Sequence, residues 1–297
     1  MKKFLIAFIL LSAPVINLHA QNDTIWRTGG ISALNFNQVS FHNWAAGGDN
    51  SISGNAVLSL YAKYKKGKWA WDNTFDFGIG GTKLAKQDTR KSDDKIDINS
   101  KVGYDLGKNF YLTYLLGFKS QFTEGFIYNA DGTRVRISNF LAPAYILNAL
   151  GIDWKPNKDL SVFISPATAK TTIVNDEVLS AAGQYGVDPG EKATTEIGAY
   201  FIMQYQHSIM ENVGFNTKLE LFSSYGNNPQ NVDVNWEVLI SLKVNKYLTA
   251  LIQTQLLYDH DIMVPKTDAN ALPGPGTQFK ESFGLGFAYK FDGVKVK

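Results

Sequence analysis

Hydrophobic and polar residues alternate with a period of two along most of the chain. In residues 51–65 the even positions are mainly apolar and the odd positions mainly polar, and the same alternation recurs beyond a turn at 65–68. Successive side chains of a β-strand point to opposite faces, so the pattern predicts strands with one apolar and one polar face. The predicted strands cover residues 30–41, 51–65, 69–79, 96–106, 110–118, 142–154, 160–166, 197–205, 213–221, 232–244, 248–258 and 279–291.

The lengths of these segments and of their connections favour a membrane barrel. Many segments reach about ten residues, which suits a tilted bilayer crossing better than the five or six residues of an ordinary strand. Short turns, such as 107–109, alternate with long loops, such as 84–94, 124–139 and 167–192. Apolar-face aromatic residues lie near the short-turn ends, where an interfacial girdle belongs. They are Tyr64, Trp69, Trp71, Trp154, Tyr247, Tyr289 and Phe291.

The fold-class prediction is therefore an all-β, transmembrane, antiparallel up-and-down β-barrel of about 12 strands, with short periplasmic turns and long extracellular loops. The sheet must close, because an unpaired backbone amide in hydrocarbon costs several kcal/mol. A soluble antiparallel sandwich is the competing fold, since it also buries one face of each strand.

The N-terminal segment has the three-part pattern of a secretory signal. Lys2 and Lys3 precede an apolar run over 4–18, and Ala20 before Gln21 provides a cleavage point. We expect a signal peptide at 1–20 and a single barrel domain at 21–297. No later apolar stretch reaches the roughly 18 residues of a membrane helix, so the predicted location is the bacterial outer membrane.

Composition excludes several kinds of chemistry. The chain has no Cys, which rules out disulfides, thiolate metal sites and a cysteine nucleophile. Without Lys2 and Lys3 the 29 basic residues fall to 27, equal to the 27 acids, whereas a nucleic-acid partner calls for a basic surface. We expect no cofactor, no metal and no nucleic-acid partner.

Residues 35–51, with the sequence NFNQVSFHNWAAGGDNS, resemble the opening motif of an uncharacterised outer-membrane β-barrel family of Gram-negative bacteria, classed as a domain of unknown function. The resemblance implies location and fold and supplies no catalytic residues. Within the motif, Trp44 followed by Gly47 and Gly48 forms either a plug or rim element or an ordinary glycine turn. The apolar alternation of 279–291 resembles the C-terminal signal that barrel-assembly machinery reads.

The polar face of the predicted strands carries charges of both signs into the lumen. In a channel such residues set selectivity, whereas in a filled barrel they form a ladder of paired ions. A barrel of about twelve strands is compatible with either arrangement. The predicted lumen-lining residues are Lys63, Asp72, Asp76, Asp97, Lys101, Lys119, Glu196, Lys218, Glu220, Asp233, Glu237 and Lys243.

Two loop features complete the candidate chemistry. Residues 175–183 read as a short helix with an N-cap, acids in its first turn and a glycine stop, placed either as a lid or as surface packing. His260 lies between Asp259 and Asp261, yet no serine nucleophile is identifiable by spacing, so we predict no enzyme.

The leading functional hypothesis is a porin-like narrow channel or a binding protein for a small solute, with outer-membrane lipid as its surroundings. A non-conducting surface scaffold and a barrel-embedded lipid-modifying enzyme are the alternatives.

Overall fold

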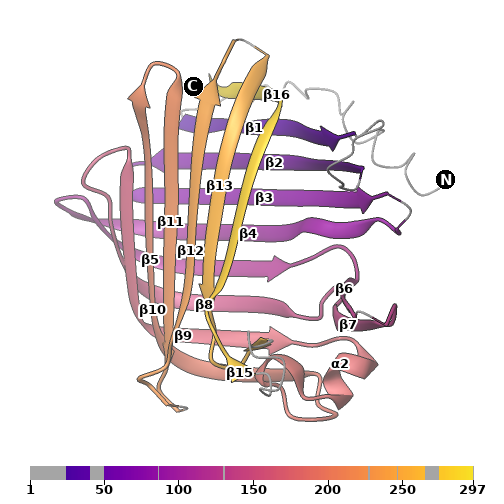
Figure 1. The fold of residues 1–297 in the computed structure, drawn as a ribbon. Coiled ribbons are helices and arrows are strands. Elements are labelled where there is room, and N and C mark those ends of the chain that lie inside the picture. Colours follow the sequence, from indigo (N-terminus) through magenta and orange to yellow (C-terminus); the bar gives the residue numbers. More distant parts are fainter. Residues whose placement is uncertain are drawn as a thin grey trace.

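The computed structural model describes residues 25–40, 50–85, 87–129, 131–226, 228–245, 247–264 and 274–296. Within these ranges twelve antiparallel strands form one closed barrel, in which neighbours in the chain pair with each other and β1 pairs with β16 (Figure 1). The barrel strands are β1 (Ile25–Val39), β2 (Ser51–Lys66), β3 (Trp69–Leu84), β4 (Arg90–Gly107), β5 (Phe110–Ser120), β8 (Ala144–Trp154), β9 (Leu160–Ile173), β10 (Ala193–Met210), β11 (Val213–Ser224), β12 (Val232–Lys243), β13 (Leu248–Tyr258) and β16 (Gln278–Val296). The predicted twelve-strand antiparallel barrel is confirmed.

The two rims of the barrel differ. At one rim, called the short-turn rim, tight turns join β2 to β3, β4 to β5 and β10 to β11. Trp26 near the start of β1 pairs there with Val296 at the end of β16, so both outermost strands have their free ends at this rim. At the other, the long-loop rim, the connections carry extra elements. These are β6 (Gly125–Tyr128), β7 (Arg134–Ser138), α2 (Glu177–Ala181), η2 (Gln184–Gly186), β14 (Met263–Val264) and β15 (Gly274–Pro275).

The long-loop rim is more ordered than the sequence pattern predicts. Residues 124–139 contain the hairpin β6–β7, and residues 167–173, predicted as loop, continue β9. Their outward positions are alanines and threonines, which give a weak apolar signal. The last strand likewise continues past the predicted end at 291. The predicted short helix is present, but its cap lies one residue later than predicted, because Asp176 rather than Asn175 caps α2 by accepting hydrogen bonds from the backbone N–H groups of Val178 and Leu179.

The outside of the barrel is apolar. Leu112, Phe283 and Phe287 are 46%, 66% and 63% exposed on outward-facing positions, where a soluble sheet would place polar residues. Among the described residues, no helix has both the length and the apolar character needed to cross a bilayer. The predicted signal segment 1–20 and the residues Trp44, Gly47 and Gly48 lie outside the described ranges.

Candidate functional site

Ion pairs cross the interior of the barrel. Lys95 on β4 places its Nζ 2.8 Å from Glu237 Oε2 on β12, and these strands are diametrically opposite in the closed order of twelve. Lys218 on β11 places its Nζ 2.6 Å from Asp97 Oδ2 on β4. Lys119 on β5 also pairs with Glu220 on β11. The side chains of opposite walls therefore touch across the lumen at this level.

Strand register brings these charges to one level. Lys218 is the direct cross-strand partner of Glu237, so both point inward side by side. On the facing wall Asp97 is the cross-strand partner of Asp76. Asp97 is 1% exposed and Glu220 is 4% exposed, whereas the Lys95 and Lys119 side chains are 28% and 32% exposed, so these two carboxylates are the part of the network that is shielded from water. Buried ions of this kind require close partners, because an unpaired buried charge is costly.

A second group of charges lies nearer the short-turn rim. Lys101 Nζ is 2.8 Å from Asp153 Oδ2, and Ser161 Oγ donates to the other oxygen of the same carboxylate at 2.8 Å. Lys155, in the turn after β8, places its Nζ 2.5 Å from Asp72 Oδ2 on β3. Asp153 is fully buried, which makes this pair part of the barrel interior rather than of its surface.

A third group lies toward the long-loop rim and is centred on Lys170. Its Nζ lies 2.6 Å from Asp233 Oδ2 and 3.7 Å from carboxylate oxygens of both Glu196 and Asp259. The Lys170 ammonium therefore lies close to three carboxylates. They belong to Glu196 on β10, Asp233 on β12 and Asp259, which directly follows β13. Phe222 packs beside it, with the Nζ 5.0 Å from the ring centroid.

Apolar side chains also pack together on the inner face of the wall formed by β5 and β8–β11. These inward-facing residues contradict the simple picture of a wholly polar lumen. They arise because the barrel interior, like a soluble core, gains from packing wherever ions do not occupy it. The cluster consists of Leu115, Ala149, Phe163, Tyr200, Ile202 and Phe222.

The predicted lumen residues fall into two sets. Most form the interior ion pairs just described, namely Asp72, Asp97, Lys101, Lys119, Glu196, Lys218, Glu220, Asp233 and Glu237. Asp76 shares their level as the partner of Asp97. Lys63 and Lys243 lie near the short-turn rim, where both are exposed.

The predicted lumen residues did not include Lys95, Asp153, Lys155 and Lys170, which the structure places in interior ion pairs. Lys170 lies in a segment predicted as loop, where alanine and threonine blur the alternation, and Lys155 follows its strand directly. The one signal in the sequence for an inward-facing charge was the carboxylate of Asp153 between the apolar residues Ile152 and Trp154.

The connection between β9 and β10 packs over the long-loop rim. Ala142, Val174, Leu179 and Val187 form a small buried apolar cluster beneath it. Gly186, with φ +73°, approaches Asp261 so closely that a Cβ would lie 3.0 Å from its carboxyl carbon. The loop thus reaches from β9 to the connection that follows β13, which is packing among the connections of the long-loop rim, and we call residues 174–192 the lid only as a name for this segment.

Polar contacts anchor this lid. Arg136 on β7 places its Nη1 2.9 Å from Asp176 Oδ2, and Asn139 donates to the same oxygen at 3.0 Å. Burial tends to raise the pKa of Asp176, but the hydrogen bonds from Asn139, the Leu179 N–H and Arg136 outweigh it and hold the pKa below its usual value. Tyr185 donates its hydroxyl proton to the Ile137 carbonyl, and burial raises the pKa of Tyr185 to about 12.

Asp259, His260 and Asp261 contact different parts of the molecule. Asp259 faces Lys170 in the lumen, Asp261 contacts the lid, and the His260 Nδ1 lies 3.4 Å from the Tyr258 hydroxyl. Neighbouring residues in an extended chain diverge, so the three side chains do not converge on one point.

One family of known sequences matches part of the chain. Residues 36–126 match the family described as "Protein of unknown function (DUF3078)". The predicted resemblance to a family of unknown function is thereby confirmed. Against curated protein sequences the chain has no match.

Several solved structures are similar to the chain at low sequence identity. The translocator domain of the autotransporter NalP from Neisseria meningitidis is 10% identical, with a TM-score of 0.38 and coverage of 97% of this chain and 96% of that one. An outer membrane channel from Pseudomonas putida F1 is 10% identical, with a TM-score of 0.37 and coverage of 94% and 100%. OmpT of Vibrio cholerae is 8% identical, with a TM-score of 0.32 and coverage of 92% and 99%.

Proposed function

We propose that this protein is an outer-membrane β-barrel with a sealed lumen, which acts as a non-conducting scaffold for the loops at its long-loop rim. The carrying observation is the contact between opposite walls through the Lys95–Glu237 and Lys218–Asp97 pairs. The leading hypothesis from the sequence, a narrow channel or a binding protein for a small solute, needs an aqueous path or cavity in the lumen, and ion pairs that bridge opposite walls argue against one.

Membrane placement is supported by the outer surface. Its outward positions are apolar between the rims, and aromatic rings gather at the short-turn rim, where Trp26 contacts Tyr64 and Trp71 at centroid distances of 5.2 and 5.7 Å. Aromatic rings at this height suit a membrane interface. We expect the protein to stay with membranes after carbonate extraction and its tryptophans to be quenched by brominated lipid. Recovery in the aqueous fraction without detergent would contradict the placement.

Planar-bilayer recording tests the sealed lumen. The wild-type protein is expected to give no discrete current steps after verified insertion. The double variant Lys95→Ala/Glu237→Ala removes one crossing pair without leaving either charge unpaired, and should give brief steps. The matched control is Asp159→Ala/His207→Ala, which removes an exposed pair with a 3.0 Å separation at the short-turn rim and should stay silent. Sustained steps from the wild type would overturn the proposal.

We further propose that His260 has no catalytic role, because its neighbours diverge toward the lumen and the lid. Purified protein should release no fatty acid from phospholipid vesicles. Release by the wild type that is lost in His260→Ala would instead support the enzymatic alternative.

A further inference from the structure

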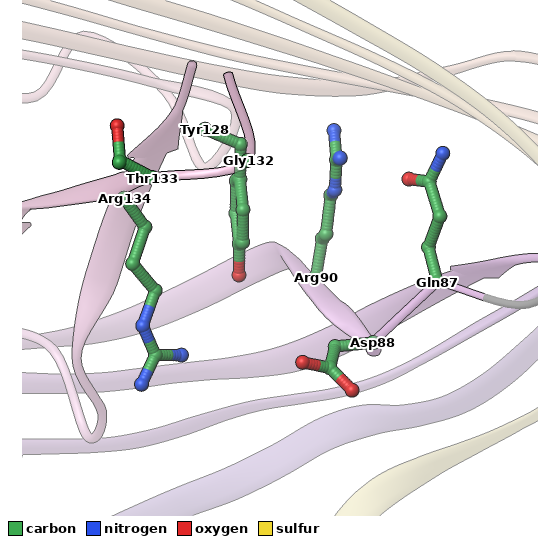
Figure 2. A pocket seen from close by; sticks show the side chains of 7 residues that line it. All are labelled: Gln87, Asp88, Arg90, Tyr128, Gly132, Thr133 and Arg134. Atoms are coloured by element: carbon green, nitrogen blue, oxygen red, sulfur yellow. The ribbon is translucent and has the colours of Figure 1, made fainter. Parts of the chain in front are cut away.

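A pocket opens at the long-loop rim between the β6–β7 hairpin and the connection from β3 to β4. Its volume is about 450 Å³, within the range of small-molecule sites. Figure 2 shows Tyr128 standing between Arg134 and Arg90, with Asp88 and Gln87 on the side of the β3–β4 connection. The lining is completed by Gly132 and Thr133.

The hairpin that forms one wall is fixed to the barrel. The Asp94 carboxylate on β4 accepts hydrogen bonds from the backbone N–H groups of Phe122 and Thr123 at 2.7 and 2.9 Å. Phe122 packs on Phe77, with ring centroids 6.3 Å apart, and Phe77 shares its face of β3 with the exposed Ile79. The base of the hairpin therefore lies against the outside of the barrel, where the apolar surface ends.

The two arginines of the pocket are held by aromatic rings rather than by acids. The guanidinium carbon of Arg90 lies 4.3 Å from the Tyr128 centroid, and that of Arg134 lies 4.3 Å from the Phe126 centroid. Neither guanidinium forms an ion pair with a carboxylate in the described part of the chain. Arg136, two residues away, has Glu124 at 2.7 Å and Asp176 at 2.9 Å.

Stacking on an aromatic ring orients a guanidinium group and leaves the N–H donors, which lie in the guanidinium plane, available to a ligand. Two such groups beside one pocket create an uncompensated positive charge, which the exposed Asp88 only partly offsets. Guanidinium donors match the oxygens of a phosphate group in bidentate geometry, and such charge-assisted bonds are strong. The Gln87 amide adds a neutral donor beside them.

We propose that this pocket binds a phosphate-bearing sugar, with the Arg90 guanidinium contacting the phosphate and Arg134 adding positive charge on the other side of Tyr128. The volume accommodates more than a bare anion, and the polar side chains of Gln87, Asp88 and Thr133 in the lining suit the hydroxyl groups of a sugar. The same chemistry belongs to a soluble sugar phosphate and to a phosphorylated saccharide headgroup of an outer-leaflet lipid. The site does not depend on a sealed lumen, so the conductance result leaves it unaffected.

The test uses the full chain in detergent micelles, titrated calorimetrically with glucose 1-phosphate and with inorganic phosphate. A second arm measures binding of the protein in nanodiscs to vesicles of phosphatidylethanolamine with and without lipid A. The double variant Arg90→Gln/Arg134→Gln should bind at least about tenfold more weakly, because charge-assisted bonds are lost. The matched control Arg27→Gln removes an exposed arginine near the short-turn rim and should bind like the wild type.

Each outcome decides the proposal. Binding of glucose 1-phosphate that depends on both arginines supports a soluble ligand, and arginine-dependent binding only to lipid A vesicles supports a lipid headgroup. Absence of binding in both arms, or an equal loss in Arg27→Gln, overturns it. Unchanged heat-modifiable mobility on gels shows that each variant retains the barrel.

Discussion

Charged side chains in the barrel interior are paired with opposite charges, whereas two arginines at the long-loop rim are not, within the residues that the structure describes. Inside, lysines and carboxylates from separate strands meet at 2.6–2.8 Å, as Lys95, Lys101 and Lys218 show. In the rim pocket, Arg90 and Arg134 stack on aromatic rings and have no carboxylate partner among the described residues.

The difference follows from access to water. A buried charge must be paired because its desolvation is otherwise uncompensated, whereas a rim charge stays hydrated and keeps its donors available for a ligand. Charges of the interior are thus expected to govern stability, and those of the pocket to govern binding. Five predictions test this division, from the largest effect to the smallest.

Asp97→Ala should lower the free energy of unfolding by about 3–5 kcal/mol, because it leaves the buried Lys218 without its closest partner. Urea unfolding in detergent micelles, followed by tryptophan fluorescence, measures the change. The control Asp188→Ala, at an exposed loop position, should shift stability by less than about 0.5 kcal/mol. Equal losses in the two variants would remove the distinction between interior and rim.

The Lys95–Glu237 pair should behave as one unit. Either single change, Lys95→Ala or Glu237→Ala, should cost about 3 kcal/mol because the remaining charge stays in the interior. The double variant should cost less than the sum of the singles, which a double-mutant cycle on unfolding free energies measures. Strict additivity would mean that the two charges do not meet across the lumen.

Asp176 is a rim carboxylate that is paired, and it should show an intermediate effect. Asp176→Ala should destabilise the lid by about 1–2 kcal/mol, since it removes the cap of α2 and a partner of Arg136. Hydrogen exchange of the Val178 and Leu179 amides measures the loss. Unchanged protection of these amides would show that the cap does not hold the lid.

The pH dependence of the same contact has a definite sign. The folded pKa of Asp176 lies below its ordinary value of 3.8, so its stabilisation is complete above that pH and is lost as pH falls through the folded pKa. Asp176→Asn keeps a capping side chain but cannot titrate. Its amide protection should therefore vary less with pH at acidic pH than that of the wild type.

Arg134→Gln should have the smallest effect on stability, below about 0.5 kcal/mol, because it breaks no ion pair in the described structure. Urea unfolding is again the measurement. A loss of unfolding free energy as large as that of Asp97→Ala would mean that Arg134 stabilises the fold as the interior charges do.

The barrel was predictable from the sequence because each strand's alternation is a local property. Ile52, Leu58 and Leu60 mark the outward face of β2 without reference to any other strand. Which charges meet was not predictable, because the Lys95–Glu237 contact joins residues 142 positions apart through the curvature of the whole sheet. The inward Phe163 was missed for the same reason, since inward positions hold ions or rings according to what the opposite wall presents.

The pocket arginines left a weaker trace in the sequence. Arg90 and Arg134 lie in segments predicted as loops, where basic residues are ordinary. Their shared pocket depends on the fold of the β6–β7 hairpin, and the alternation over so few residues did not predict it. Asp176, by contrast, belongs to a capping motif whose chemistry is complete within three residues.

The side-chain ion pairs that join β4 to β11 and β12 across the interior also constrain how the barrel assembles in the membrane. Until the C-terminal half of the polypeptide arrives, Asp97 and Lys95 have no counter-ions from those strands, so a half-formed sheet carries exposed ionic groups that resist transfer into lipid. Closure of the barrel and pairing of its interior charges must therefore occur together. Premature release of an incomplete intermediate into the bilayer is correspondingly disfavoured.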